Sequence, residues 1–304
     1  MQPASPSASA VALAPAEWRA RRERHEARVD GWTAGYLSRA SRREKHPVDD
    51  FLFTYYSHSP GRLRRWSPGP AVVLIDHPAD TPFVAVDGGA VLGPVPERVR
   101  RTGAFVADLL RRTAERAPQL GCFGLHEWAM VYRGERRHED FPLRLGQQET
   151  DGVVDALGLR CSHHDAFRFF TPSAGPLNLL QPTREAQVDI EQPGCLHANM
   201  DLYKWSYKLS PFVPSELVAD CFDLARRIRA LDMQASPYDL SDLGVAPVRV
   251  ETAEGRAAYA KAQAAFAEEA AVLRARVLEA VQRLVEHVPV IVPAWGATSA
   301  APSS

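Results

Sequence analysis

Two long stretches near the C-terminal end of the chain repeat apolar residues every three or four positions. In residues 214–233 and 254–288 the repeat is carried by Leu217, Val218, Cys221, Phe222, Ala225 and Ile228, and by Phe266, Ala270, Leu273, Val277, Val281, Leu284 and Val288. Because an α-helix makes one turn in about 3.6 residues, this spacing gathers the apolar side chains on one face. Such faces are buried against other helices, so the stretches predict an antiparallel pair joined by a loop at residues 235–250. We expect this pair to be scaffold and not part of a functional site.

The rest of the chain predicts further helices and one small β element. Helices are expected at residues 16–43, 47–56, 97–117, 121–132 and 150–157. A turn at Ser59, Pro60 and Gly61 should end the second of them, and residues 167–170 are predicted as a strand or a loop. Residues 71–75 and 83–91, punctuated by Gly88 and Gly89, predict a strand pair.

These patterns together predict a mainly α protein. We expect a single helical domain at residues 16–290, with a small β hairpin insertion and the C-terminal antiparallel helix pair. Residues 1–15 and 291–304 are rich in Ala, Ser and Pro, so they predict disordered tails.

Composition argues against several classes of protein. No apolar run approaches the roughly 20 residues that span a bilayer, so we expect a soluble protein with no membrane partner. The four cysteines, Cys122, Cys161, Cys195 and Cys221, form no C-x-x-C pair, which argues against a disulfide framework or a structural zinc site and favours a cytoplasmic location. Residues 1–147 hold 22 Lys and Arg against 17 Asp and Glu. The arginines at residues 19–116 could contact nucleic-acid phosphates, although solvated helix faces explain most of them more simply.

Three segments combine histidine, acidic and aromatic residues more densely than an ordinary surface helix needs. They are residues 44–56, 124–132 and 195–208. In the third segment, helical spacing places His197, Asp201, Lys204 or Trp205, and Lys208 along one stripe. We predict that the three segments share one pocket.

The histidines of these segments, His46, His126 and His197, are expected to converge in that pocket. His126 and Glu127 are adjacent in sequence, so they should point to different faces and at most one should enter it. The candidate catalytic residues are Asp201, Glu127, Asp50, His197, His126 and His46.

His197 and Asp201 stand at i and i+4, a spacing at which helical bundles bind iron or manganese. The same spacing also suits a local hydrogen bond that fixes a buried imidazole. Residues 163–165 add two histidines and an aspartate as possible ligands. The single Glu-x-x-His motif, Glu135 to His138, lies in a charged stretch that we expect to be exposed. A metal is therefore an option that the sequence leaves open.

Several side chains could bind a flat substrate by stacking or by charge. These candidates are Tyr55, Tyr56, Trp128, Tyr203, Lys204 and Trp205. A neighbouring carboxylate could then orient a water molecule. Ordinary core packing is the alternative explanation for the aromatic residues.

Residues 44–56 and 195–205 resemble blocks of a bacterial family commonly labelled 3-methyladenine DNA glycosylase. The similarity runs from about Trp18 to Val288. The resemblance implies that the chain binds DNA and hydrolyses the N-glycosyl bond of alkylated purines such as 3-methyladenine, without a cofactor. Asp201 is then the first choice for the carboxylate that orients water, ahead of Glu127 and Asp50.

The chain departs from helix-hairpin-helix glycosylases at residues 243–247, where Ala246 takes the place of the second hairpin glycine. Two alternatives therefore stay open. One is a metal-dependent helical enzyme, oxidase or hydrolase-like, that uses a His and carboxylate cluster with iron, manganese or zinc on a small-molecule substrate. The other is a small-molecule binding module.

Overall fold

The computed structural model describes residues 11–134 and 141–286, and most of these residues are helical. The α-helices of this part of the chain are α1 Pro15–Ser41, α2 Phe51–Thr54, α3 Pro60–Arg64, α4 Glu97–Ala114, α5 Leu125–Ala129, α6 Gly146–Leu157, α7 His164–Phe167, α8 Gln187–Ile190, α9 Leu196–Lys208, α10 Ser215–Gln234 and α11 Ala253–Glu286. Short 3-10 helices occur at Gly175–Leu177 and Ser241–Leu243. The fold is mainly α, as predicted from the sequence.

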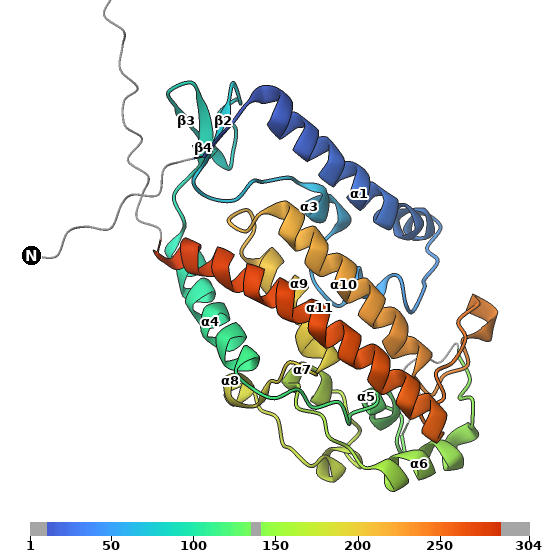
Figure 1. The fold of residues 1–304 in the computed structure, drawn as a ribbon. Helices are drawn as coiled ribbons and strands as arrows, with labels where there is room; N and C mark the ends of the chain where they lie inside the picture. Colours follow the sequence, from blue (N-terminus) through green and yellow to red (C-terminus); the bar gives the residue numbers. More distant parts are fainter. Residues whose placement is uncertain (1–10, 135–140, 287–304) are drawn as a thin grey trace, which may run out of the picture.

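Helix α9 lies at the centre of the fold. It packs against α10 and α11, while α4 lies along α11 and α1 along α10 (Figure 1). Figure 1 also shows α10 and α11 running in opposite directions, which confirms the predicted antiparallel pair. Because helices surround α9, nine of its thirteen residues are buried, polar ones among them. A buried polar group must find a partner, so the position of α9 forces its polar side chains into contact with neighbouring segments.

A small sheet lies at one end of the helical body. Its strands β1 Val11–Leu13, β2 Val72–Ile75, β3 Phe83–Val86 and β4 Gly89–Leu92 have the order β1-β2-β4-β3. The predicted strand pair is therefore a three-stranded antiparallel unit, to which β1 adds a parallel strand. Gly88 turns the β3–β4 hairpin with a positive φ of 73°. Gly89 has no room for a Cβ, because the carbonyl of Leu74 occupies that space.

The sequence prediction of a disordered tail at residues 1–15 is wrong at its end. Leu13 is buried against Trp18, Trp66 and Leu74, so β1 gains both backbone hydrogen bonds and apolar contacts. Residues 1–10 and 291–304, where the remaining tail predictions fall, lie outside the described residues. In the part of the chain that the structure describes, no helix is long and apolar enough to cross a membrane.

Two local predictions also need correction. Ser59 begins a helix instead of ending one, since its hydroxyl caps α3 by accepting from the Arg62 amide and Pro60 fits the first helical turn. The helix predicted at residues 121–132 is reduced to α5, because Gly124 before it is left-handed, with φ of 69°. Residues 168–170 form a turn, in agreement with the strand or loop predicted at 167–170, and Phe167 is the last residue of the short helix α7.

Candidate metal centre

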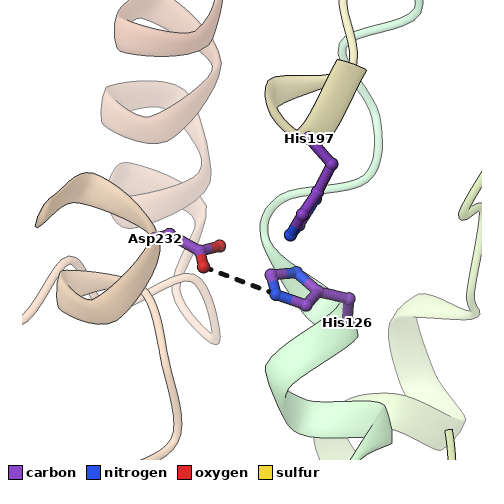
Figure 2. A group of neighbouring side chains, drawn as sticks. All are labelled: His126, His197 and Asp232. Carbon is purple, nitrogen blue, oxygen red and sulfur yellow. Dashed lines mark ion pairs between the residues drawn. The ribbon is translucent and has the colours of Figure 1, made fainter. Parts of the chain in front are cut away.

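Two histidines and one aspartate from three separate elements converge on a single point inside the protein. They are His126 of α5, His197 of α9 and Asp232 of α10, and their ligand atoms all lie within 4.8 Å of one another. Figure 2 shows the three side chains pointing toward a common space between their segments. His126 Nε2 lies 3.4 Å from Asp232 Oδ2, and the two imidazole rings are 4.1 Å apart in an edge-on arrangement.

One oxygen of this group lacks a partner. Oδ1 of Asp232 is buried and accepts no hydrogen bond from the described residues. The other oxygen, Oδ2, accepts from Nη1 of Arg229 at 2.9 Å. A buried carboxylate oxygen without a donor is costly, and a bound cation would remove that cost.

Glu127 and Arg229 set the charge beside the centre. Nη1 of Arg229 also donates to Glu127 Oε1 at 2.8 Å, and the guanidinium lies 4.0 Å from the ring centre of Phe51. Burial would raise the pKa of Glu127, but Arg229 and His126 outweigh burial and hold that pKa well below its ordinary value. Glu127 is therefore ionised at neutral pH.

The two histidines differ in charge when no metal is bound. Burial opposes the charged form of His126, but Asp232 and Glu127 raise its pKa to about 9. For His197, burial and the nearby His126 outweigh the carboxylates of Asp232 and Asp201 and lower its pKa to about 3. An imidazolium thus faces a neutral imidazole at neutral pH.

A second group of His, Glu and Asp lies beside the first. Nε2 of His163 is 3.3 Å from Asp201 Oδ2 and 3.4 Å from Glu191 Oε1, and all three side chains are buried. Asp201 also accepts from the Tyr56 hydroxyl at 2.9 Å and from Lys204 Nζ at 2.7 Å. Burial would raise the pKa of Asp201, but Lys204 and His163 hold it well below its ordinary value.

Two cavities reach the first group, and His126 and His197 line both of them. The larger, of about 310 Å³, is also lined by Gln192, Tyr259 and the three cysteines Cys122, Cys161 and Cys195. The other, of about 280 Å³, is lined by Phe51, Tyr55, Met130, Phe169, Glu127, Asp165, Ala166 and Arg229. Small molecules could therefore approach His126 and His197 from two directions.

Of the three histidines expected to converge, the structure brings together His126 and His197. His46 lies elsewhere: its Nδ1 accepts from the amide of Asp49 at 3.1 Å, and it lines neither of the two cavities. Asp50 accepts from Arg39 at 2.7 Å and from the His46 amide at 2.8 Å, so its hydrogen bonds are satisfied within its own region. The segment 44–56 still reaches the second cavity, through Phe51 and Tyr55.

The structure differs from three further expectations about the site. Both His126 and Glu127 line the second cavity, because all five residues of the short helix α5 are buried and none of its faces is turned to solvent. Helix α10, expected to be scaffold alone, supplies Arg229 and Asp232 to the candidate centre. Residues His197 and Asp201 share α9 but belong to two different groups.

Most of the predicted stacking residues are part of the core. Trp128 is fully buried and donates to the carbonyl of Ala235, and Tyr203 is likewise fully buried. Trp205 packs against Phe105 and lies under the ammonium groups of Lys204 and Lys208. Tyr56 is bound to Asp201, and Lys204 bridges Asp165 and Asp201. Of the six candidates, Tyr55 is the one that lines either cavity.

Sequence reasoning missed Asp232, Arg229 and Glu191. Asp232 and Arg229 interrupt the apolar repeat of α10 at buried positions, a signal that the sequence offers. Glu191 follows the four-residue helix α8 in an irregular region, where no periodicity marks it. The motif Glu135 to His138 lies outside the described residues.

Comparisons of this chain with models of protein families, with curated proteins and with solved structures find no match. The case for its function therefore depends on the geometry of the site.

Proposed function

We propose that the protein is a metal-dependent enzyme of the hydrolase type, with a divalent transition-metal ion held by His126, His197 and Asp232. Two imidazoles and one carboxylate are a donor set that iron, manganese and zinc accept, and three protein ligands leave positions free for water and substrate. The observation that carries the proposal is the convergence of these three ligand atoms within 4.8 Å, beside two cavities that His126 and His197 line.

The metal ion would supply a bound water of lowered pKa, a nucleophile at neutral pH. Glu127 lines the cavity of about 280 Å³, together with His126 and His197, and its Oε1 lies 3.7 Å from His126 Nε2. Its low pKa makes this carboxylate a weak base, so we assign to it the orientation of the water through a hydrogen bond. Hydrolysis is favoured over oxidation because it needs no co-reactant besides water.

Metal content tests this proposal. Protein purified without chelator, or loaded after EDTA treatment, should hold zinc, manganese or iron, measured by inductively coupled plasma mass spectrometry. His197→Gln and Asp232→Asn should each lower the affinity of this site about 10-fold or more. Asp220→Asn is the matched control, because Asp220 lies on the same helix α10 but pairs with Arg28 and Arg276 at the surface. A wild-type protein that holds no metal and cannot be loaded would refute the proposal.

Removal of alkylated purines from DNA stays a second candidate. One observation favours it: Phe51, Tyr55 and Phe169 stand in the cavity that also contains the Glu127 carboxylate, a combination suited to a flat base and a water molecule. Asp201, the residue predicted to orient that water, is 1 % exposed and already bound by Tyr56 and Lys204. Glu127 is better placed for that task.

An oligonucleotide that carries 3-methyladenine or 7-methylguanine tests this candidate. Wild-type protein should create abasic sites above the spontaneous rate, and Glu127→Gln should lose most of that excess while it keeps salt-dependent DNA binding. Release of no alkylated base by pure wild-type protein would exclude it. A cytoplasmic location is proposed for either activity.

A further inference from the structure

We propose a second divalent-cation site at His163, Glu191 and Asp201, which makes the centre dinuclear. This inference rests on the proposed function, because it assigns a partner ion to the metal held by His126, His197 and Asp232. The ligand atoms of the second group also lie within 4.8 Å of one another. One imidazole and two carboxylates suit the same metals as the first group: zinc, manganese and iron.

The second group is assembled by three segments that are far apart in sequence. His163 caps α7, Glu191 follows α8, and Asp201 lies in the middle of α9. None of the three is more than 2 % exposed. Such burial of one imidazole and two carboxylates is costly unless charge compensates charge, and a divalent cation compensates both carboxylates at once.

The carboxylate of Glu191 is the part of this group that most needs a cation. Among the described residues it forms an ion pair with His163 and with no Lys or Arg, and its other contact is the neutral amide of Gln187 at 2.8 Å. Arg116 reaches the backbone carbonyl of Glu191 and not its side chain. Asp201 has Lys204, but Lys204 is shared with Asp165 at the same distance of 2.7 Å. An ion bound by Asp201 would take over the pairing with that carboxylate, and Lys204 would then pair with Asp165 alone.

Helix α9 places the two groups side by side. His197 belongs to the first group and Asp201 to the second, and four residues of helix rise by about 6 Å. The rings of His163 and His197 are 5.5 Å apart. Two cations at these positions would interact electrostatically. The added positive charge of the second ion would favour hydroxide over water at the first.

The two ions should differ in how easily they leave. His126 and His197 line both cavities, whereas His163, Glu191 and Asp201 line neither. The first ion is therefore open to a chelator, while release of the second requires the fold to open locally. We expect chelation by EDTA to proceed in two phases, with the second ion in the slower one.

Metal stoichiometry, measured by native mass spectrometry on the full chain loaded with zinc, tests the inference. The wild type should bind two ions. Glu191→Gln and His163→Gln should each bind one and lose the slow phase of chelation, whereas Asp232→Asn should bind one and lose the fast phase. Asp189→Asn is the matched control, since Asp189 lies on α8 but pairs with Arg112 at the surface, and it should keep two ions.

The outcomes separate this inference from the proposed function. One ion that Asp232→Asn removes and Glu191→Gln retains would overturn the second site and leave the first. One ion that Glu191→Gln removes and Asp232→Asn retains would support the second site and overturn the first. No ion in the wild type would overturn both. Far-UV circular dichroism of each variant checks folding, and Glu191→Gln keeps the size of the side chain, so loss of an ion in a folded variant is attributable to the ligand.

Discussion

Replacing Arg229 by methionine tests whether this guanidinium holds the buried charges beside the candidate centre in balance. The side chain of Arg229 is 3 % exposed and donates to Glu127 at 2.8 Å and to Asp232 at 2.9 Å. Methionine has a similar length and can keep the contact with Phe51. The substitution thus removes a charge and three hydrogen bonds, the third of them to the Pro47 carbonyl at 3.4 Å, and leaves two carboxylates buried.

The expected loss follows from what stays behind. Removal of one partner from a buried ion pair costs about 3–5 kcal/mol. For the metal-free protein we expect the free energy of unfolding to fall by about 3 kcal/mol, the lower end of that range. The loss is at the lower end because the imidazolium of His126 remains 3.4 Å from Asp232 and 3.7 Å from Glu127 and still offsets part of their charge. A divalent ion at the first site should restore part of the loss, so zinc should stabilise Arg229→Met more than it stabilises the wild type.

Urea denaturation followed by circular dichroism at pH 7, with EDTA and then with zinc, measures both effects. Arg227→Met is the matched control, since Arg227 lies on the same helix but is 36 % exposed and pairs with Asp223 and Glu269. An exposed pair of this kind is worth less than about 1 kcal/mol. Equal losses in the two variants would refute the argument that Arg229 balances buried charge.

Three other perturbations test the surroundings of the site. Tyr56→Phe removes a buried hydrogen bond of 2.9 Å to Asp201 and should lower the free energy of unfolding by about 1.5–3 kcal/mol in urea; a loss below about 0.5 kcal/mol would contradict the bond. Burial and, to a lesser extent, Arg62 lower the pKa of His58 from 6.5 to about 4 in the folded protein. As the pH falls from 6.5 toward 4, the unfolded chain therefore takes up a proton before the folded protein does, and the free energy of unfolding decreases. His58→Gln should therefore remove up to about 3 kcal/mol of the stability difference between pH 7 and pH 4, and an unchanged difference would count against the shift. Gly124→Ala should lower the free energy of unfolding by about 1–2 kcal/mol, because φ is 69° and a Cβ would lie 3.2 Å from Tyr259. Because Gly124 sets the path of α5, the substitution should also weaken zinc binding. Calorimetry measures both effects, and unchanged values would contradict this role.

The long helices could be predicted from the sequence because their burial is one-sided and periodic. Apolar spacing alone located α4, α10 and α11 within a few residues. The short elements depend on contacts with other segments instead of on local apolar spacing. Strand β1 forms because Leu13 reaches a pocket made by Trp18 and Leu74, a contact between distant segments that no local pattern records.

Part of the site could also be predicted. His126, Glu127 and His197 were found because polar and aromatic residues are dense around them. His46 and Asp50 stand in an equally dense segment, yet Arg39 and the local backbone satisfy them, so density does not distinguish a site from a capped turn. Trp128 and Tyr203 show the same limit for aromatic residues, which are core in this fold.

The apolar repeat marks Asp232, the candidate ligand that the sequence analysis missed. Continuing the repeat of α10 from Ala225 and Ile228 by four residues leads to Arg229 and Asp232, so charged residues occupy positions whose spacing predicts burial. The same step from Ala270 in α11 leads to Arg274, which is also buried and donates to Asn199. A charge on a buried stripe thus predicts a polar contact inside the protein, because an unpaired charge there would be too costly. The sequence does not say which of these contacts is a site. Arg274 donates to a single amide, that of Asn199, whereas Asp232 lies with two histidines beside two cavities. This convergence distinguishes a candidate metal ligand from an ordinary buried charge.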